Sequence, residues 1–102
     1  MVHGHNKYQS RENRARVREL FIDEWDPIGV RGVSEATDEY DAYVAKAYVM
    51  LMDERATAEQ ITDYLWGVAT EYMGLTPYPA LRDRCADTAK MLIAVRPDFE
   101  TH

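Results

Sequence analysis

Residues 40–52 read YDAYVAKAYVMLM, and this stretch decides the fold because only Asp41 and Lys46 within it are charged. A helix with about 3.6 residues per turn would present apolar residues on two sides here. One side would carry Tyr40, Tyr43, Val44, Ala47, Met50 and Leu51, and the other Ala42, Ala45, Val49 and Met52. A helix that is apolar almost all round belongs in the middle of a bundle or at an interface. We therefore expect a central helix that is covered on both sides.

The start of this helix is acidic. We expect Thr37 to be its N-cap, with Ser34 as the alternative, because hydroxyl side chains accept hydrogen bonds from the free amides of a first turn. The carboxylates of Asp38, Glu39 and Asp41 then lie near the positive end of the helix dipole. Capping and solvation therefore explain this acidic group without any chemistry.

An earlier helix is predicted from an N-cap at Ser10 to about Trp25. Its apolar arc consists of Val17, Leu20, Phe21 and Trp25. Residues 1–9 have no apolar periodicity, so we expect a flexible N-terminal arm there. The folded domain is then expected to comprise residues 10–102.

A long connection follows, from Asp26 to about Thr37. Pro27 separates it from the first helix, since the residue before a proline avoids the helical conformation. The connection exceeds the usual median of about 4–6 residues, and its apolar residues Ile28, Val30 and Val33 predict an ordered loop. Loops of this kind often carry function, so a site could lie here.

Charge is unevenly distributed along the chain. The net charge of −6 argues against general affinity for nucleic acid. Residues 1–18 are nevertheless basic, whereas residues 19–41 are acidic. Arg11, Arg14 and Arg18 follow one flank of the first helix at spacings of three and four. We expect their stems to cover apolar surface while their heads lie in water or pair with carboxylates.

Thr57 predicts the start of a third helix, because Gln60 three residues later completes a capping box. Its expected apolar face consists of Ile61, Leu65, Val68, Ala69, Tyr72 and Met73. Gly74 is expected to be its C-cap glycine. Gly67 lies inside this helix at a cost of up to about 1 kcal/mol relative to alanine, and we expect a close helix crossing to be the reason.

The last helix is predicted to begin within residues 76–79, since prolines are tolerated in a first turn, and to end at Pro97. Its apolar face is predicted to consist of Leu81, Cys85, Thr88, Ala89 and Leu92. There is no internal repeat. These patterns together predict an all-α fold, a compact four-helix single domain with a central apolar second helix.

Three short motifs mark the middle of the chain: Trp25-Asp26-Pro27-Ile28-Gly29, then Asp38-Glu39-Tyr40-Asp41 with Tyr43, and Met73-Gly74-Leu75. In these motifs the chain resembles a family of small uncharacterised bacterial helical proteins, a domain of unknown function with a Trp-Asp-Pro-Ile-Gly motif. The resemblance spans most of the stretch from Leu20 to Leu75. It implies a short, helical, cytoplasmic protein. It assigns no catalytic residue, because no activity is attached to that family.

The sequence lacks the usual catalytic and metal-binding patterns. Its histidines, His3, His5 and His102, are all terminal, which removes the usual general base, the nucleophilic triads and the paired-histidine zinc sites. Cys85 then has no partner and fits a buried, inert thiol. No calcium-loop spacing or glycine-rich phosphate loop is present. We therefore predict no enzyme activity, no metal and no cofactor.

Binding to another protein remains as the expected role. We predict a non-enzymatic protein-interaction module, with a homodimer as one arrangement and with no nucleic-acid or membrane partner. A single cysteine and no run of about 18 apolar residues make the bacterial cytoplasm the expected location. The alternative is an acidic immunity or inhibitor-like protein that neutralises a basic partner such as a nuclease toxin. The expected partner-binding residues are Trp25, Asp26, Asp38, Glu39, Asp41 and Tyr43.

Overall fold

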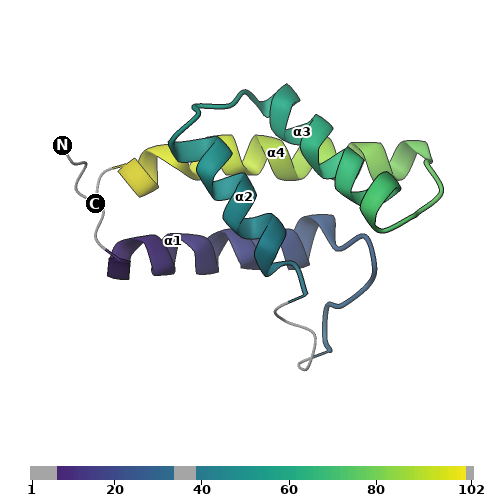
Figure 1. Ribbon diagram of the computed structural model, residues 1–102, viewed down its shortest axis with the longest axis horizontal. Helices are drawn as coiled ribbons and strands as arrows, with labels where there is room; N and C mark the ends of the chain where they lie inside the picture. The colour runs from purple at the N-terminus through teal and green to yellow at the C-terminus, as the bar shows by residue number, and fades with distance from the viewer. Residues whose placement is uncertain (1–6, 34–38, 101–102) are drawn as a thin grey trace.

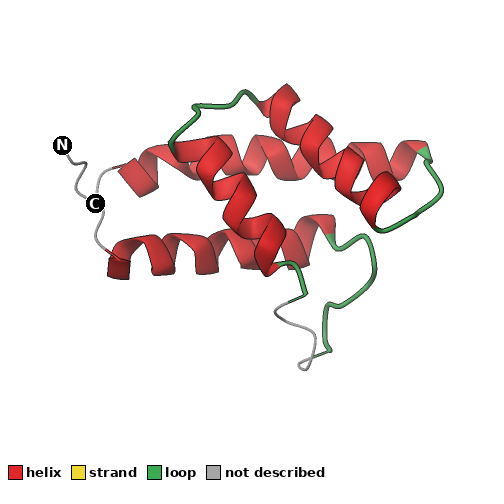
Figure 2. Ribbon diagram, in the orientation of Figure 1, coloured by secondary structure: helices red, strands yellow, loops and turns green. Residues whose placement is uncertain are grey.

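The computed structural model describes residues 7–33 and 39–100 of the chain. Throughout these residues the structure is all-α and contains no strand, which confirms the predicted four-helix domain (Figure 2). The predicted caps Ser34 and Thr37 lie outside the described residues, as does Asp38. The helices are α1 (Lys7–Leu20), α2 (Asp41–Met52), α3 (Ala58–Gly67) and α4 (Pro79–Glu100), with π-helical turns η1 (Phe21–Trp25) after α1 and η3 (Val68–Tyr72) after α3.

The helices form a small bundle in which α1 and α4 run antiparallel while α2 and α3 cross them obliquely (Figure 1). Helix α2 contacts each of the other three helices, as expected of a central helix, and the long helix α4 does the same. One continuous cluster of buried apolar side chains joins all four, with Phe21, Trp25, Leu51, Leu65 and Leu92 among its largest members. Within the described residues, no helix has the length and apolar content needed to cross a membrane.

Helix α1 begins earlier than the sequence predicts. It is helical from Lys7, so the N-cap expected at Ser10 is wrong, and residues 7–9 belong to the folded domain rather than to a flexible arm. The side-chain amide of Gln9 donates a hydrogen bond of 3.1 Å to Asn13 one turn later, which supports this first turn. The end near Trp25 is confirmed.

Helix α2 is buried on one side only. Val44, Ala47 and Leu51 face the core, whereas Ala42, Ala45 and Val49 are exposed; Val49 retains 40% of its accessible surface. The expectation that both sides are covered is therefore wrong for the single chain, because α1, α3 and α4 all pack against the same side. Tyr40 occupies the N-cap position without any side-chain cap. A homodimer that covers the exposed side stays a prediction.

Helix α3 starts and stops where its caps predict. The Thr57 hydroxyl accepts a hydrogen bond of 3.1 Å from the Gln60 amide, and the Gln60 side chain accepts one of 2.8 Å from the Thr57 amide. Gly74 follows the π-helical turn at φ +71°, a conformation that glycine adopts without steric cost. The predicted capping box and C-cap glycine are confirmed.

Gly67 has a different explanation from the one expected. A Cβ atom built on this residue would find no heavy atom within 4 Å. The predicted close helix crossing is therefore wrong, because no other helix approaches the backbone here. Gly67 also has ordinary helical angles, φ −61° and ψ −42°. Nothing in the structure requires glycine at this position.

Helix α4 begins at Pro79 as predicted but continues through Pro97 to Glu100, so the expected stop at Pro97 is wrong. Tertiary contacts hold this last turn. Phe99 is buried, and its ring centroid lies 6.0 Å from that of Tyr48 on α2. The Arg96 guanidinium lies 3.4 Å from the carbonyl oxygen of Leu51, which gives the end of α4 a polar contact with α2 as well.

Candidate functional site

The two aromatic residues predicted to bind a partner lie in or against the core. Trp25 is fully buried, with its ring centroid 5.2 Å from that of Phe21 and 5.3 Å from that of Tyr40. Tyr43 is half-buried, and its ring meets the Trp25 ring edge-on at 6.4 Å. Trp25 therefore stabilises the core and offers no surface to a partner in this structure, whereas part of Tyr43 stays accessible.

Asp26 organises the loop that follows α1. Its backbone lies in the left-handed region at φ 33°. Its carboxylate accepts hydrogen bonds of 2.7 Å from the Val30 amide and 3.1 Å from the Arg31 amide, and a third of 2.9 Å from the Tyr40 hydroxyl. The Tyr40 oxygen in turn accepts a bond of 3.2 Å from the Ile28 amide. These bonds hold residues 26–31 of the loop together, and they engage the Asp26 carboxylate.

Burial determines the protonation state of this cluster. Desolvation raises the pKa of Tyr40 far above its ordinary value, and the neighbouring Asp26 carboxylate raises it further. The hydroxyl therefore stays protonated at physiological pH and can donate to Asp26. This contact joins the loop to the start of α2, which gives the aspartate and the tyrosine a structural role at these positions.

The carboxylates of the acidic stretch that the structure describes differ in their surroundings. Asp41 pairs with Arg18 on α1, and Asp23 lies 3.7 Å from Arg31. Glu39 is exposed. Nowhere in residues 7–33 and 39–100 do three or more His, Cys, Asp or Glu side chains gather in a way that could hold a metal ion.

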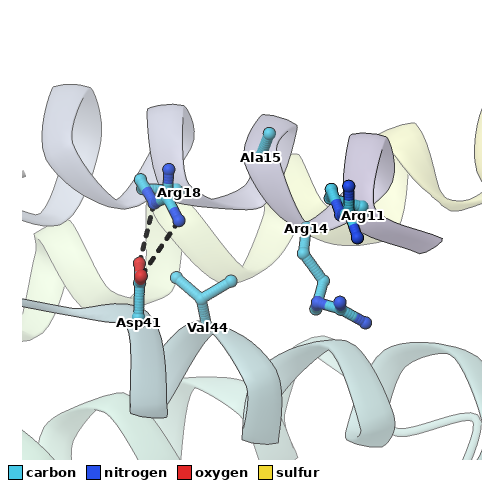
Figure 3. Close-up of a pocket in the computed structure, with 6 residues that line it drawn as sticks. All are labelled: Arg11, Arg14, Ala15, Arg18, Asp41 and Val44. Carbon is cyan, nitrogen blue, oxygen red and sulfur yellow. Dashed lines mark hydrogen bonds and ion pairs between the residues drawn. The ribbon is translucent and has the colours of Figure 1, made fainter. Parts of the chain in front are cut away.

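A groove between α1 and α2 gathers the arginine row instead (Figure 3). It encloses a pocket of about 210 Å³. The residues that line it are Arg11, Arg14, Ala15 and Arg18 from α1 and Asp41 and Val44 from α2. Three guanidinium groups and one carboxylate leave this lining with a net positive charge, on a chain whose formal net charge is −6. We refer to it as the arginine groove.

Arg18 and Asp41 close one end of the arginine groove. Nε and Nη2 of Arg18 donate to the two carboxylate oxygens of Asp41 at 2.7 and 2.9 Å, a bidentate pair that fixes both side chains (Figure 3). Nearer the start of α1, the buried Asn13 amide donates to the Tyr48 hydroxyl of α2 at 3.0 Å. These two contacts hold α2 antiparallel to α1 and keep the distance between the helices fixed.

Arg11 and Arg14 have no such partners. Both are exposed, and within the described part of the chain neither makes a hydrogen bond or ion pair. The reason lies in α2, where no acidic residue occurs between Asp41 and Asp53. Val44, which lines the groove beside Asp41, is apolar and only 3% exposed (Figure 3). The arginine groove therefore contains two cations that are free to bind an anion.

The sequence reasoning identified the arginine row but not this site. It correctly allowed an arginine to pair with a carboxylate, which Arg18 does. Periodicity within one helix does not show which of the arginines faces an acid on the neighbouring helix. The signal was present, since α2 carries only Lys46 as a charge after Asp41. Which residues of α2 lie beside which residues of α1 is known only from the structure.

Cys85 lies on the buried side of α4, as predicted. Burial raises the pKa of its thiol, and the nearby Trp25 indole and the Arg82 and Arg84 guanidinium groups oppose that effect only in part. The thiol is therefore neutral at physiological pH, which makes it a poor nucleophile.

Comparison of the chain with family models, with curated proteins and with solved structures gave no match. The resemblance to a family of small bacterial helical proteins stays a prediction. The arginine groove is the feature of the described residues that points to a function.

Proposed function

We propose that this protein is a non-enzymatic interaction module that binds an acidic segment of a partner protein in the arginine groove. The observation that carries the proposal is the pair of unpartnered guanidinium groups, Arg11 and Arg14, in a groove whose lining has a net positive charge. Guanidinium groups form paired, charge-assisted hydrogen bonds with carboxylates and phosphates. An acidic side chain could therefore bind the two free arginines of the groove.

The size of the groove supports a side chain rather than a whole small molecule as the occupant. Its volume of about 210 Å³ is below the range of about 300–1,000 Å³ that is usual for small-molecule and cofactor sites. No aromatic ring lines it, so a nucleotide base would have no stacking surface. These features favour a terminal anionic group that belongs to a larger partner.

The charge of the whole molecule favours a specific orientation of binding. The net charge of −6 repels an acidic partner over most of the surface. Attraction is confined to the positively charged groove, so the partner is oriented before contact. The alternative role as an acidic inhibitor of a basic toxin has less support, since Asp26 and Asp41 are already engaged by groups of this chain.

The test is fluorescence anisotropy with a labelled glutamate-rich peptide at low and at moderate salt. We expect the Arg14→Glu variant to bind at least about tenfold more weakly, which corresponds to about 1.4 kcal/mol. Arg16→Glu is the matched control, because Arg16 is exposed on the same helix but does not line the groove. Binding by the native protein should weaken as salt rises. Equal losses in both variants, or no binding at low salt, would contradict the proposal.

A further inference from the structure

We infer that the arginine groove selects a phosphate monoester, as carried by phosphoserine or phosphothreonine in a protein, over a carboxylate. The inference rests on the proposed function, since it specifies the anion that the groove binds. It depends on three features of the groove: its net charge, the number of free donors and the fixed position of Arg18.

The net charge of the groove matches a dianion. Arg11, Arg14 and Arg18 contribute three positive charges and Asp41 removes one, so two remain. A phosphorylated side chain carries about −1.5 to −2 charges at neutral pH, whereas a glutamate or aspartate carries one. A carboxylate would therefore leave one positive charge of the groove unbalanced, and a phosphate monoester would balance both.

The donors lie on successive turns along one face of α1. Arg11 and Arg14 are three residues apart, and such residues are neighbours on one face of a helix. Arg18 lies one turn further along on the same face and binds Asp41 through Nε and Nη2, which leaves its Nη1 without a bond in the described residues. Three guanidinium groups can thus donate to the three terminal oxygens of a phosphate. A carboxylate offers only two oxygens.

Asp41 acts as a positioning residue in this arrangement. It fixes the Arg18 guanidinium before any ligand arrives, which lowers the side-chain entropy that binding has to remove. The Arg18 and Asp41 side chains are 41% and 43% exposed, so a ligand in the groove can reach the pair. Arg11 and Arg14 remain free to adjust to the ligand.

The experiment compares three peptide pools with degenerate flanking positions and a central phosphoserine, glutamate or serine. Binding to the intact protein is measured by anisotropy at equal salt. We expect the phosphoserine pool to bind at least about tenfold more tightly than the glutamate pool, and the serine pool not to bind. Because the second phosphate pKa is about 6, binding of the phosphoserine pool should weaken from pH 7.5 to pH 5. Binding of the glutamate pool should change much less over this range.

Two controls locate the interaction. NMR signals of the Arg11 and Arg14 Nε–H groups should shift when inorganic phosphate is added, and those of Arg16 should not. Arg14→Glu should abolish the preference for the phosphoserine pool, whereas Arg16→Glu should retain it.

The outcomes separate this inference from the proposed function. Equal affinity for the phosphoserine and glutamate pools would overturn the phosphate preference and leave the acidic-segment proposal intact. Failure of both pools to bind would overturn both proposals. A preference for phosphoserine that survives Arg14→Glu would place the phosphate site elsewhere and overturn the inference.

Discussion

At the scale of single residues, the carboxylate of Asp26 connects two parts of the chain. It accepts bonds from two backbone amides of its own loop and from the Tyr40 hydroxyl at the start of α2. The local bonds explain why an aspartate follows the π-helical turn, and the bond to Tyr40 fixes where α2 begins.

We expect Asp26→Asn to lower the free energy of unfolding by about 1.5–3 kcal/mol, since a hydrogen bond to a charged group contributes about that much. Asparagine tolerates the left-handed backbone of this position, so the substitution tests the carboxylate rather than the main chain. Urea denaturation followed by circular dichroism measures the change. A loss below about 0.5 kcal/mol, the size usual for a surface substitution, would show that the contact is not stabilising.

The double variant of Asp26→Asn with Tyr40→Phe supplies the control for this experiment. If the two side chains act through their shared bond of 2.9 Å, the two losses should not add. Additive losses would mean that each residue acts through other contacts.

At the scale of helices, Gly67 is the residue whose replacement should stabilise the protein. We expect Gly67→Ala to raise the free energy of unfolding by about 0.5–1 kcal/mol, because its backbone is helical and no atom lies near an added Cβ. Thermal unfolding measures this gain. Gly74→Ala is the matched control and should destabilise by about 1–2 kcal/mol, since Gly74 has a positive φ. A destabilised Gly67→Ala variant would contradict the prediction.

Helical periodicity predicted most of these elements, and its failures have local causes. The predicted buried face of α4 is confirmed, since all of its residues are buried: Leu81, Cys85, Thr88, Ala89 and Leu92. Tyr72, in contrast, was expected on the apolar face of α3 and is 80% exposed. The wider π-helical turn of residues 68–72 rotates the later positions away from a register of about 3.6 residues per turn. A single sequence gives no sign of such a turn.

Pro97 shows the opposite kind of failure. Its local chemistry predicts the end of a helix, but the buried Phe99 beyond it holds another turn of α4 against α2. The arginine groove was missed for a related reason. The sequence places the arginines on one flank of α1. Only the position of α2 beside α1 shows which of these arginines have no acidic partner.

At the scale of the whole molecule, two tyrosines and the cysteine determine how the free energy of unfolding depends on pH in the alkaline range. Burial raises the pKa of Tyr64 to about 12, and it raises those of Tyr40 and Cys85 as well. Each group binds its proton more tightly in the folded chain than in the unfolded chain. Unfolding therefore releases protons above the ordinary pKa values, so the stability from these groups is complete below them and is lost as pH rises.

We expect the free energy of unfolding to fall between pH 10 and pH 12, the interval between the ordinary pKa of Tyr64, 10.0, and its raised value of about 12. Urea denaturation at a series of pH values measures the slope. Tyr64→Phe removes one of the titrating groups and should make the slope shallower. Tyr8→Phe is the control, since Tyr8 is exposed at the start of α1. An unchanged slope in the Tyr64→Phe variant would exclude this residue as a cause.

The contacts that join α1 to α2 are also ordered by their separation along the chain. Asp26 and Tyr40 are 14 residues apart, Arg18 and Asp41 are 23 apart, and Asn13 and Tyr48 are 35 apart. Closing a loop costs more chain entropy as the loop lengthens, but a contact already formed shortens the next loop. The two helices can thus zip together from the loop outward, each step closing only a short additional segment. The loop around Asp26 is then the place from which folding of this half of the bundle can start.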